Sequence, residues 1–316
     1  MTEKHKQFIR NLVPIFTLLI LVFGIAAYEP GFLRPRNLMT VTADTMTLFL
    51  MASGATLVIM LGSIDLSIQA IASMTSCIVA AMLPMFGGTA LLFALAAGAA
   101  AGILSGLVVN YLRIPSFVAT LAIGGIMTSV AFWASNERSI YISDEDKLVW
   151  LNWATGTTAG IDHEVVVGLA VLAVLSVILS LTRFGRLVRA VGSQERAVVA
   201  SGINVNGVKF FAFVISGFMA GLAGLVMAAR LGSGSPTLAS EFLLPAIACI
   251  IVGGTAITGG VGSIWKTFVG ALIIAVVRIG MTFVGVTVFA QQIVFGLVLV
   301  LAVAMTIDRT KVSVVK

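Results

Sequence analysis

The stretch VVVGLAVLAVLSVILSLT, residues 165–182, is a continuous apolar run without a charged side chain. A helix of about 20 apolar residues crosses the hydrocarbon core of a bilayer. A run of this length favours a helix, because the strands of a membrane barrel show segments of about ten residues with alternating polarity. The stretch therefore predicts a transmembrane helix, and similar runs recur on both sides of it.

The composition of the whole chain agrees with that prediction. Of its 316 residues, 59% are hydrophobic and only 10% are charged, and the mean hydropathy is +1.11. A water-soluble chain this apolar would not have enough polar residues to cover its surface. We therefore predict an all-α, polytopic integral membrane protein, with residues 1–316 forming a single transmembrane domain.

Polar breaks divide the chain into about ten predicted spans, which places both termini on the same side of the membrane. The first span follows a basic start, which is also typical of a cleaved signal peptide. We favour an uncleaved helix because nine more spans follow. The predicted spans are 12–28, 43–62, 66–86, 89–110, 117–134, 165–182, 210–229, 243–258, 266–285 and 288–307.

The charges indicate which side is cytoplasmic. Segment 183–209 holds five basic residues and one acid, whereas segment 135–164 holds six acids and two basic residues. Cytoplasmic loops carry an excess of Lys and Arg, so we place segment 183–209 and both termini in the cytoplasm. The termini are themselves basic, with Glu3, Lys4, Lys6 and Arg10 at one and Asp308, Arg309, Lys311 and Lys316 at the other. Three arginines depart from this pattern, because the predicted topology places them on the outer side of the membrane: Arg34, Arg36 and Arg230. A fourth, Arg278, falls within a predicted span.

Segment 183–209 is the longest cytoplasmic connection. RLVRAVGSQERAVVAS, residues 186–201, is a good helix former without proline. It stops at GINVNG, where Gly202 and Asn204 suit a helix end and a turn. Such a helix is either a topology signal alone or a surface that docks into another protein.

Within this segment a family resemblance becomes visible. Glu195-Arg196-Ala197, with Gly202 seven positions after Glu195, resembles the Glu-Ala-Ala…Gly coupling motif of ATP-binding-cassette importer permeases. Over almost all of residues 40–307 the chain resembles the ribose and monosaccharide permeases of that superfamily. The stretches that carry this resemblance are LVIMLGSIDLSI (57–68), RIPSFVATLA (113–122), SGINVN (201–206), SGFMAGLAGLVMAARLGSGSPT (216–237) and AIACIIVGGTAITGGVGSIWKTFVGALI (246–273).

The chain also departs from the family pattern. Family members usually have Gly-Gly-Ile-Asp-Leu-Ser followed by Val-Gly-Ser, whereas here Gly62-Ser63-Ile64-Asp65-Leu66-Ser67 leads into Ile68-Gln69-Ala70. Arg278 stands in a span where an uncharged residue is expected. Both departures leave the particular sugar open.

The resemblance implies a permease subunit in a bacterial inner membrane, which it crosses many times. Two permease copies would form the pathway, a periplasmic sugar-binding protein would deliver the solute, and separate ATPase subunits holding ATP and Mg²⁺ would supply the energy. The chain itself is expected to be no enzyme and to bind no cofactor, metal or nucleic acid. Its nearest match to a phosphate-binding loop, GGVGSIWKT (259–267), has Trp265 where that motif needs glycine. The residues that we assign to ATPase coupling are Arg189, Gly192, Glu195, Arg196, Ala197, Gly202 and Asn204.

Four residues are candidates for the solute pathway: Asp65, Ser67, Phe117 and Thr120. An acid in or near a span costs about 2.5–3.5 kcal/mol on insertion scales and needs a partner or water. Asp65 either lines the path or caps the third span together with Ser67, and Phe117 is either an apolar gate or a packing residue. Asp44 is expected to face the outer interface, and Arg278 is a possible counter-ion for either acid.

Other patterns concern packing. Gly98, Gly102 and Gly106 recur at a spacing of four, as do Gly217 and Gly221, which favours close helix contact. LVIMLGSIDLSIQAIAS (57–73) and ACIIVGGTAITGGVGSI (248–264) both interrupt an apolar run with Gly and hydroxyl residues, as the broken helices of transporters do. Cys77 and Cys249 are expected to be packing residues. Trp150 and Trp153 mark the outer segment as an interfacial anchor or as a surface for the binding protein.

Alternative functions remain open from the sequence. A related permease would move branched-chain amino acids or a sugar-like signal molecule. An ion-driven secondary transporter would carry more acids within its spans, and an intramembrane enzyme would need a nucleophile and base there. The sequence does not select the sugar, or decide between two identical and two different permease copies.

Overall fold

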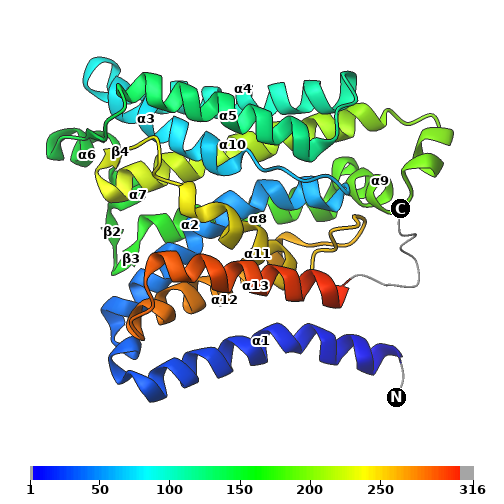
Figure 1. Cartoon of the computed structure of the whole chain (residues 1–316), viewed down its shortest axis with the longest axis horizontal. Coiled ribbons are helices and arrows are strands. Elements are labelled where there is room, and N and C mark those ends of the chain that lie inside the picture. Colours follow the sequence, from blue (N-terminus) through cyan, green and yellow to red (C-terminus); the bar gives the residue numbers. More distant parts are fainter. Residues whose placement is uncertain (1–2, 307–316) are drawn as a thin grey trace.

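The structure is a computed structural model in which residues 3–306 are described, with side chains from Ile15 to Leu301. Long helices run side by side as a bundle (Figure 1). They are α1 (Glu3–Tyr28), α2 (Pro35–Met60), α3 (Ile68–Phe86), α4 (Thr89–Tyr111), α5 (Ser116–Ser135), α8 (His163–Leu181), α10 (Val205–Leu231), α12 (Ile264–Phe283) and α13 (Val288–Thr306), with the short α11 (Leu243–Val252) among them.

Seven helices in the described part of the chain are long and apolar enough to cross a membrane: α2, α3, α4, α5, α8, α10 and α12. Three shorter apolar helices accompany them, at Ile15–Tyr28, Ser240–Val252 and Val288–Leu301. The all-α, polytopic fold class is therefore confirmed, whereas the count of ten spans stays a prediction. The cytoplasmic placement of the termini also stays a prediction, and the charges at Asp308, Arg309, Lys311 and Lys316 lie outside the described residues.

The connections gather at the two ends of the bundle. Helix α9 (Arg183–Ala200) lies at the end where α1 begins and α13 ends (Figure 1). We call this the inner end and the opposite end the outer end, following the predicted topology. The outer end holds short elements: η1 (Pro30–Leu33), α6 (Asp144–Trp150), α7 (Asn152–Thr155), η2 (Ser240–Phe242) and the two-residue strand pairs β1 (Ile140–Tyr141) with β4 (Ser233–Gly234) and β2 (Thr157–Thr158) with β3 (Ile161–Asp162).

Helix α2 forms the centre of the bundle. It packs against α8, α10, α11 and α12, and its apolar stretch is wholly buried. Its hydroxyl side chains bond back to the helix, as in Thr45 to the Val41 carbonyl at 2.7 Å and Thr56 to the Ala52 carbonyl at 2.8 Å. These bonds satisfy polar groups that have no water to bind within a bundle. The helix begins at Pro35, earlier than the predicted start at 43, because proline suits the first helical turn.

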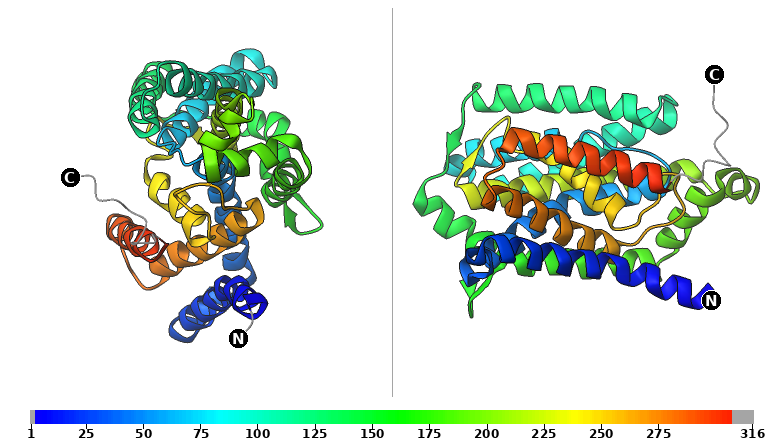
Figure 2. Two further views of the ribbon diagram at one scale, coloured as in Figure 1. Left: turned by 90° about the vertical axis from the view of Figure 1, so that its right-hand side faces the viewer. Right: turned by 60° about the horizontal axis from the view of Figure 1, so that its bottom comes forward.

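The peripheral helices are α1 and α13, which lie at the edge of the bundle in the left view of Figure 2. Helix α1 packs along α12, where Ile25 occupies the space beside Gly280. Most of the described side chains of α1, among them Phe16, Ile20 and Phe23, are exposed. An apolar helix exposed in this way suits a lipid environment rather than a water-filled one.

The predicted glycine seam is confirmed between α4 and α10. A Cβ atom at Gly98 would lie 2.8 Å from the Gly217 carbonyl oxygen, and one at Gly217 would lie 2.7 Å from the Gly102 Cα. The helix backbones touch at these positions, so no larger residue fits. Close approach of this kind replaces the hydrophobic driving force that is missing between helices in lipid.

We expect Gly217→Leu to destabilise the protein strongly, because the added side chain has to push α4 and α10 apart. Overpacking a close contact costs about 1–3 kcal/mol or more. Thermal unfolding of the purified protein in detergent measures the effect. The matched control is Gly296→Leu in α13, where a Cβ meets nothing within 4 Å. Equal unfolding temperatures for the two variants would contradict the close contact of α4 and α10 at these glycines.

Two helical runs are interrupted at the positions that the sequence echo marked. The chain leaves α2 at Met60 and returns through residues 61–67 to the start of α3, and it leaves α11 at Val252 and stays non-helical through residue 263. The predicted span 243–258 is therefore wrong beyond Val252, since α11 has only 10 residues and covers about 15 Å at 1.5 Å per residue. Gly254, with φ of 90°, adopts a conformation that ends the helix.

The acidic outer segment 135–164 is folded onto the bundle rather than forming a loose loop. Its strand β1 pairs with β4, and the Trp150 ring covers the turn between α3 and α4, where a Cβ at Gly88 would meet it. Trp153 packs partly buried against the core. Asp144 and Glu145 of α6 remain exposed at the outer end, whereas Asp146 is partly buried.

Candidate transport pathway and coupling surface

Helix α9 confirms the helix predicted for the basic segment. Thr182 accepts a hydrogen bond from the Gly185 backbone N–H at 3.3 Å and so caps its start. The helix is kinked at Gln194, whose φ of −154° and ψ of 66° are not helical. Val188 and Val191 face the bundle and are buried, whereas the segment 193–197 is exposed. The kink therefore presents the Glu195 motif outward at the inner end.

The end of α9 also follows the sequence. Gly202 has φ of 76°, a left-handed conformation that suits glycine after a helix. Asn204 accepts a hydrogen bond from the Gly207 N–H at 3.0 Å and caps α10. These two residues fix the turn from α9 into the long helix α10.

The charged residues of the segment have internal partners. Glu195 accepts a hydrogen bond from the Lys209 ammonium group at 2.7 Å, and Arg189 donates to the Leu179 carbonyl in the last turn of α8 at 2.8 Å. Arg196 and Ala197 are exposed. Arg189 thus ties α9 to α8, while Glu195, half of whose side chain is exposed, remains accessible to another protein.

Gly192 brings α9 against both helix interruptions. A Cβ at Gly192 would overlap the Met60 carbonyl oxygen and the Gly260 nitrogen. These two atoms belong to different interruptions and bond to each other, since the Gly260 N–H donates to the Met60 carbonyl at 2.8 Å. A displacement of α9 therefore acts directly on both non-helical segments.

Asp65 lies buried where α3 begins and is 2% exposed. Its carboxylate accepts hydrogen bonds from the Ser67 N–H at 3.0 Å, from the Ser67 hydroxyl at 2.6 Å and from the Ser216 hydroxyl of α10 at 2.7 Å. The bond to the Ser67 N–H forms an Asx turn before α3, and the predicted cap is not formed, because the N-cap residue Ser67 makes no side-chain cap hydrogen bond. In this conformation the carboxylate does not reach open space, so its part in the pathway stays a prediction.

Two hydroxyls of α5 hold the first interruption in place. The Ile64 N–H donates to Ser116 at 3.0 Å, and the Leu66 N–H donates to Thr120 at 3.0 Å. Non-helical backbone within a membrane protein needs such partners, because no water is there to bind it. Thr120 is fully buried and supports the interruption in this conformation, so its part in the pathway stays a prediction.

A polar cavity of about 540 Å³ opens at the inner end. It brings the candidate pathway residue Phe117, 54% of which is exposed, together with Glu195 of the coupling segment. It does not include Asp65, Ser67 or Thr120. The lining residues are Gly62, Ser63, Val109, Asn110, Arg113, Ile114, Pro115, Ser116, Phe117, Glu195, Asn206 and Lys209.

The sequence did not indicate most of the polar residues of this cavity. Asn110 comes from the end of α4, whereas Asn206 and Lys209 come from the start of α10, and only the fold brings these two helix ends together. Arg113 carried a local signal, because it stands two residues before Pro115 in a tight turn. Its φ of 56° is rare for a residue with a side chain.

Charged residues are paired inside the outer half of the bundle. Arg278 donates to Asp44 at 3.0 Å, and its guanidinium lies 4.2 Å from the centre of the Phe242 ring. Of the two acids proposed as its partner, the structure selects Asp44. The expectation that Asp44 faces the outer interface is wrong, because the residue is 8% exposed. Pairing is the usual arrangement for charges within spans.

A second acid, Glu164, was not predicted to be in the bundle. It accepts a hydrogen bond from Thr47 at 2.5 Å and lies 3.9 Å from Arg230. This contact gives Arg230, one of the arginines that departs from the charge rule, a partner at the outer end. The only sequence signal for Glu164 is its position directly before the apolar run of α8.

We expect Arg278→Leu alone to lower stability by about 3–5 kcal/mol, because it leaves the Asp44 charge buried without a partner. The double variant Asp44→Leu with Arg278→Leu should recover most of that loss. Unfolding in detergent measures both, and the exposed Arg36→Leu is the control. A double variant less stable than Arg278→Leu would show that the unpaired Asp44 charge does not cause the loss of stability.

Within the described residues no group of three or more His, Cys, Asp and Glu side chains is placed to hold a metal ion. Cys77 and Cys249 are both buried and unbonded to each other, in keeping with their prediction as packing residues.

Sequence comparison with known proteins places this chain in a family. The family described as branched-chain amino acid transport system / permease component matches residues 37–303. The ribose import permease protein of Escherichia coli (strain K12) is 33% identical over 302 residues, which cover 94% of each chain. The ribose import permease protein of Bacillus subtilis (strain 168) is 32% identical over 96% of this chain and 94% of its own. An L-arabinose ABC transporter permease protein of Azospirillum brasilense is 29% identical over 94% and 87%.

Proposed function

The chain belongs to the branched-chain amino acid transport system / permease component family, and on that premise we propose that it is the membrane-spanning permease subunit of an ATP-binding-cassette importer for a monosaccharide. Relatives of matching length that are named for ribose import and for L-arabinose transport support a monosaccharide as the transported solute. The subunit provides the pathway and is not itself an enzyme. It resides in a bacterial inner membrane.

One observation carries the mechanism. Helix α9 exposes the Glu195 motif at the inner end and touches both helix interruptions through Gly192. A partner that grips the exposed part of α9 and moves it therefore shifts residues 60–62 and 259–260 together. In the proposed mechanism the partner is a cytoplasmic ATPase, whose closure on ATP and Mg²⁺ supplies the movement.

The solute path follows from the same contacts. The cavity at the inner end borders the first interruption, the start of α5 and Glu195. When α9 moves the first interruption, the hydrogen bonds that the Ile64 and Leu66 N–H groups donate to Ser116 and Thr120 must break and be replaced. We propose that Phe117 lies at the inner exit, where its exposed ring obstructs the path until the interruption shifts.

Two further partners complete the proposed assembly. A periplasmic sugar-binding protein docks on the outer end, where the first turn of α6 exposes Asp144 and Glu145. A second permease copy packs against one of the exposed helix faces, since only 33%, 33% and 28% of the spans of α4, α5 and α8 are buried in a single chain. The pathway then runs between two copies.

The substrate is tested by competition. Proteoliposomes that hold this chain, its ATPase and its binding protein should accumulate labelled D-ribose or L-arabinose, with no effect of excess leucine. The family description favours one alternative, a branched-chain amino acid. Uptake of leucine that neither sugar inhibits would establish that alternative and overturn the monosaccharide.

A further inference from the structure

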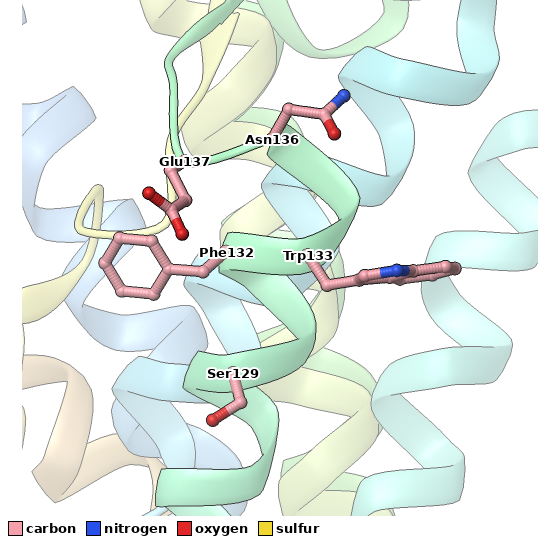
Figure 3. Close-up of a pocket in the computed structure, with 5 residues that line it drawn as sticks. All are labelled: Ser129, Phe132, Trp133, Asn136 and Glu137. Atoms are coloured by element: carbon pink, nitrogen blue, oxygen red, sulfur yellow. The ribbon is translucent and has the colours of Figure 1, made fainter.

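The outer end of α5 carries a cleft in which two aromatic rings are combined with polar side chains. A cavity of about 540 Å³ is lined by Ser129, Phe132, Trp133, Asn136 and Glu137. Figure 3 shows the rings of Phe132 and Trp133 extending to opposite sides of the helix, with Asn136 and Glu137 at one end of the cleft and Ser129 at the other. The cleft lies at the opposite end of α5 from Phe117.

Helix geometry and a strained turn build this cleft. Ser129, Phe132, Trp133 and Asn136 follow one another at the helical spacings of three and four, and the successive rings of Phe132 and Trp133 flank this face on either side (Figure 3). Asn136 and Glu137 then have φ of 49° and 60°, and the Glu137 N–H donates to the Phe132 carbonyl at 2.9 Å. Two successive side-chain-bearing residues in left-handed conformations are costly and gather at functional sites. Here they turn the Glu137 carboxylate back over Phe132 (Figure 3).

The face differs from one that meets lipid tails. The exposed residues of α8 are almost all aliphatic, as in Val166, Leu169 and Val174. The exposed face of α5 instead has Gly125 and Ser129 beside the apolar Ile126 in its outer half, with the Ser129 hydroxyl bonded to the Gly125 carbonyl at 3.0 Å, and it continues into the polar end of the cleft. Ionisable residues in a membrane span usually face a water-filled cavity, and Glu137 stands at the outer end of this face.

We propose that this cleft is a sugar-binding site at the outer mouth of the pathway, which takes the ring of a neutral monosaccharide as it leaves the binding protein. Aromatic faces carry negative partial charge and suit the C–H face of a sugar ring. The Asn136 amide both donates and accepts hydrogen bonds, and the Glu137 carboxylate accepts them from hydroxyl groups. Trp133, 80% exposed, would be covered by the sugar.

Charge supports a neutral ligand. Glu137 is the one ionisable side chain that lines the cleft, and its negative charge opposes an anionic sugar phosphate or sugar acid. The inference rests on the proposed function for the direction of transport, but the binding itself is a property of this chain alone. The experiment therefore has one arm for binding and one for transport.

In the binding arm, D-ribose is titrated into the purified chain in detergent while tryptophan fluorescence is recorded. We expect a saturable change for the wild type that is lost in Trp133→Phe and kept in Trp153→Phe. A change that survives in Trp133→Phe, or no change in the wild type up to molar sugar, would overturn the site.

In the transport arm, the complete importer in proteoliposomes is supplied with sugar-loaded binding protein. Asn136→Ala and Trp133→Ala should lower uptake about tenfold, while ATPase stimulation by the binding protein stays within about twofold. Trp133→Tyr should keep uptake near the wild-type value. Phe289→Ala is the control, since Phe289 is an 84% exposed aromatic residue at the outer end of α13.

The two arms separate the possible failures. Normal uptake by Trp133→Ala would make Trp133 an interfacial anchor only and would overturn the site. Ribose binding without any ATP-driven uptake by the wild type would support the site and contradict the proposed function instead.

Discussion

Glu195→Ala is expected to lower ATP-driven sugar uptake at least tenfold while the protein still inserts and folds. In the proposed complex the carboxylate meets the ATPase, and loss of one partner of a charged interfacial pair costs about 2–5 kcal/mol. Folding should be preserved because the residue is exposed at the inner end. The measurement is uptake in proteoliposomes beside the amount of ATPase that co-purifies.

The matched control for this prediction is Lys209→Ala. It removes the same 2.7 Å ion pair within the chain but leaves the Glu195 carboxylate in place for a partner. We expect Lys209→Ala to keep at least half of the uptake. Equal losses in the two variants would mean that the ion pair, and not a contact with the ATPase, is what Glu195 provides.

The combination of Glu195→Ala with Arg189→Ala should abolish coupling completely. Arg189 holds α9 to the last turn of α8 through the Leu179 carbonyl, so its loss lets α9 move without the bundle. ATP hydrolysis by the bound ATPase would then continue while the sugar is no longer carried. Unchanged uptake in this double variant would remove the coupling role from α9.

Gly192→Leu is the second change with a large expected effect. The side chain would have to occupy the contact between α9 and the two interruptions, where a Cβ already overlaps the Met60 carbonyl. We expect uptake to fall by more than tenfold and binding-protein stimulation of the ATPase to be lost. Uptake and stimulated ATPase activity are measured on the same proteoliposomes.

Ala200→Leu at the end of α9 is the control, because Ala200 is exposed, whereas Ser193 itself lies against Gly260. Gly192→Ala gives a graded test that is less prone to misfolding, and its uptake should fall between the wild type and Gly192→Leu. If Gly192→Leu unfolds no earlier and transports like the wild type, α9 does not act through the interruptions.

The sequence predicted the parts of the fold that depend on composition and local spacing. Apolar runs indicated the membrane helices, and the glycines at a spacing of four indicated the α4–α10 contact. Residues 186–201 indicated α9 because they form a good helix that ends at a glycine. The resemblance on the Glu195 motif and the SGINVN stretch indicated the family that the comparison confirms.

What the sequence could not supply was the position of polar groups within the bundle. The run 243–258 is apolar enough for a span, yet the positive φ angle at Gly254 ends the helix early, and hydropathy does not depend on backbone conformation. Asp44 and Arg278 are 234 residues apart in the chain, so their pairing depends on how α2 and α12 pack.

The candidate site likewise has one part that local sequence predicts and another that depends on how the helices pack. The turn at Gly202 and Asn204 was predicted from local preferences and is confirmed. The inner cavity joins residues from the α2–α3 interruption, α4, α5, α9 and α10, and no local pattern indicates that these lie together. The coupling and pathway roles of the named residues stay predictions until transport is measured.

The most direct test of the account is the energy source for transport. Ribose uptake is measured in proteoliposomes that hold this chain, its ATPase and its binding protein, with ATP and Mg²⁺ or with a proton or sodium gradient alone. The account predicts accumulation only with hydrolysable ATP, and none with a gradient. Gradient-driven uptake by this chain without the ATPase would contradict it, and α9 would then be a topology signal alone.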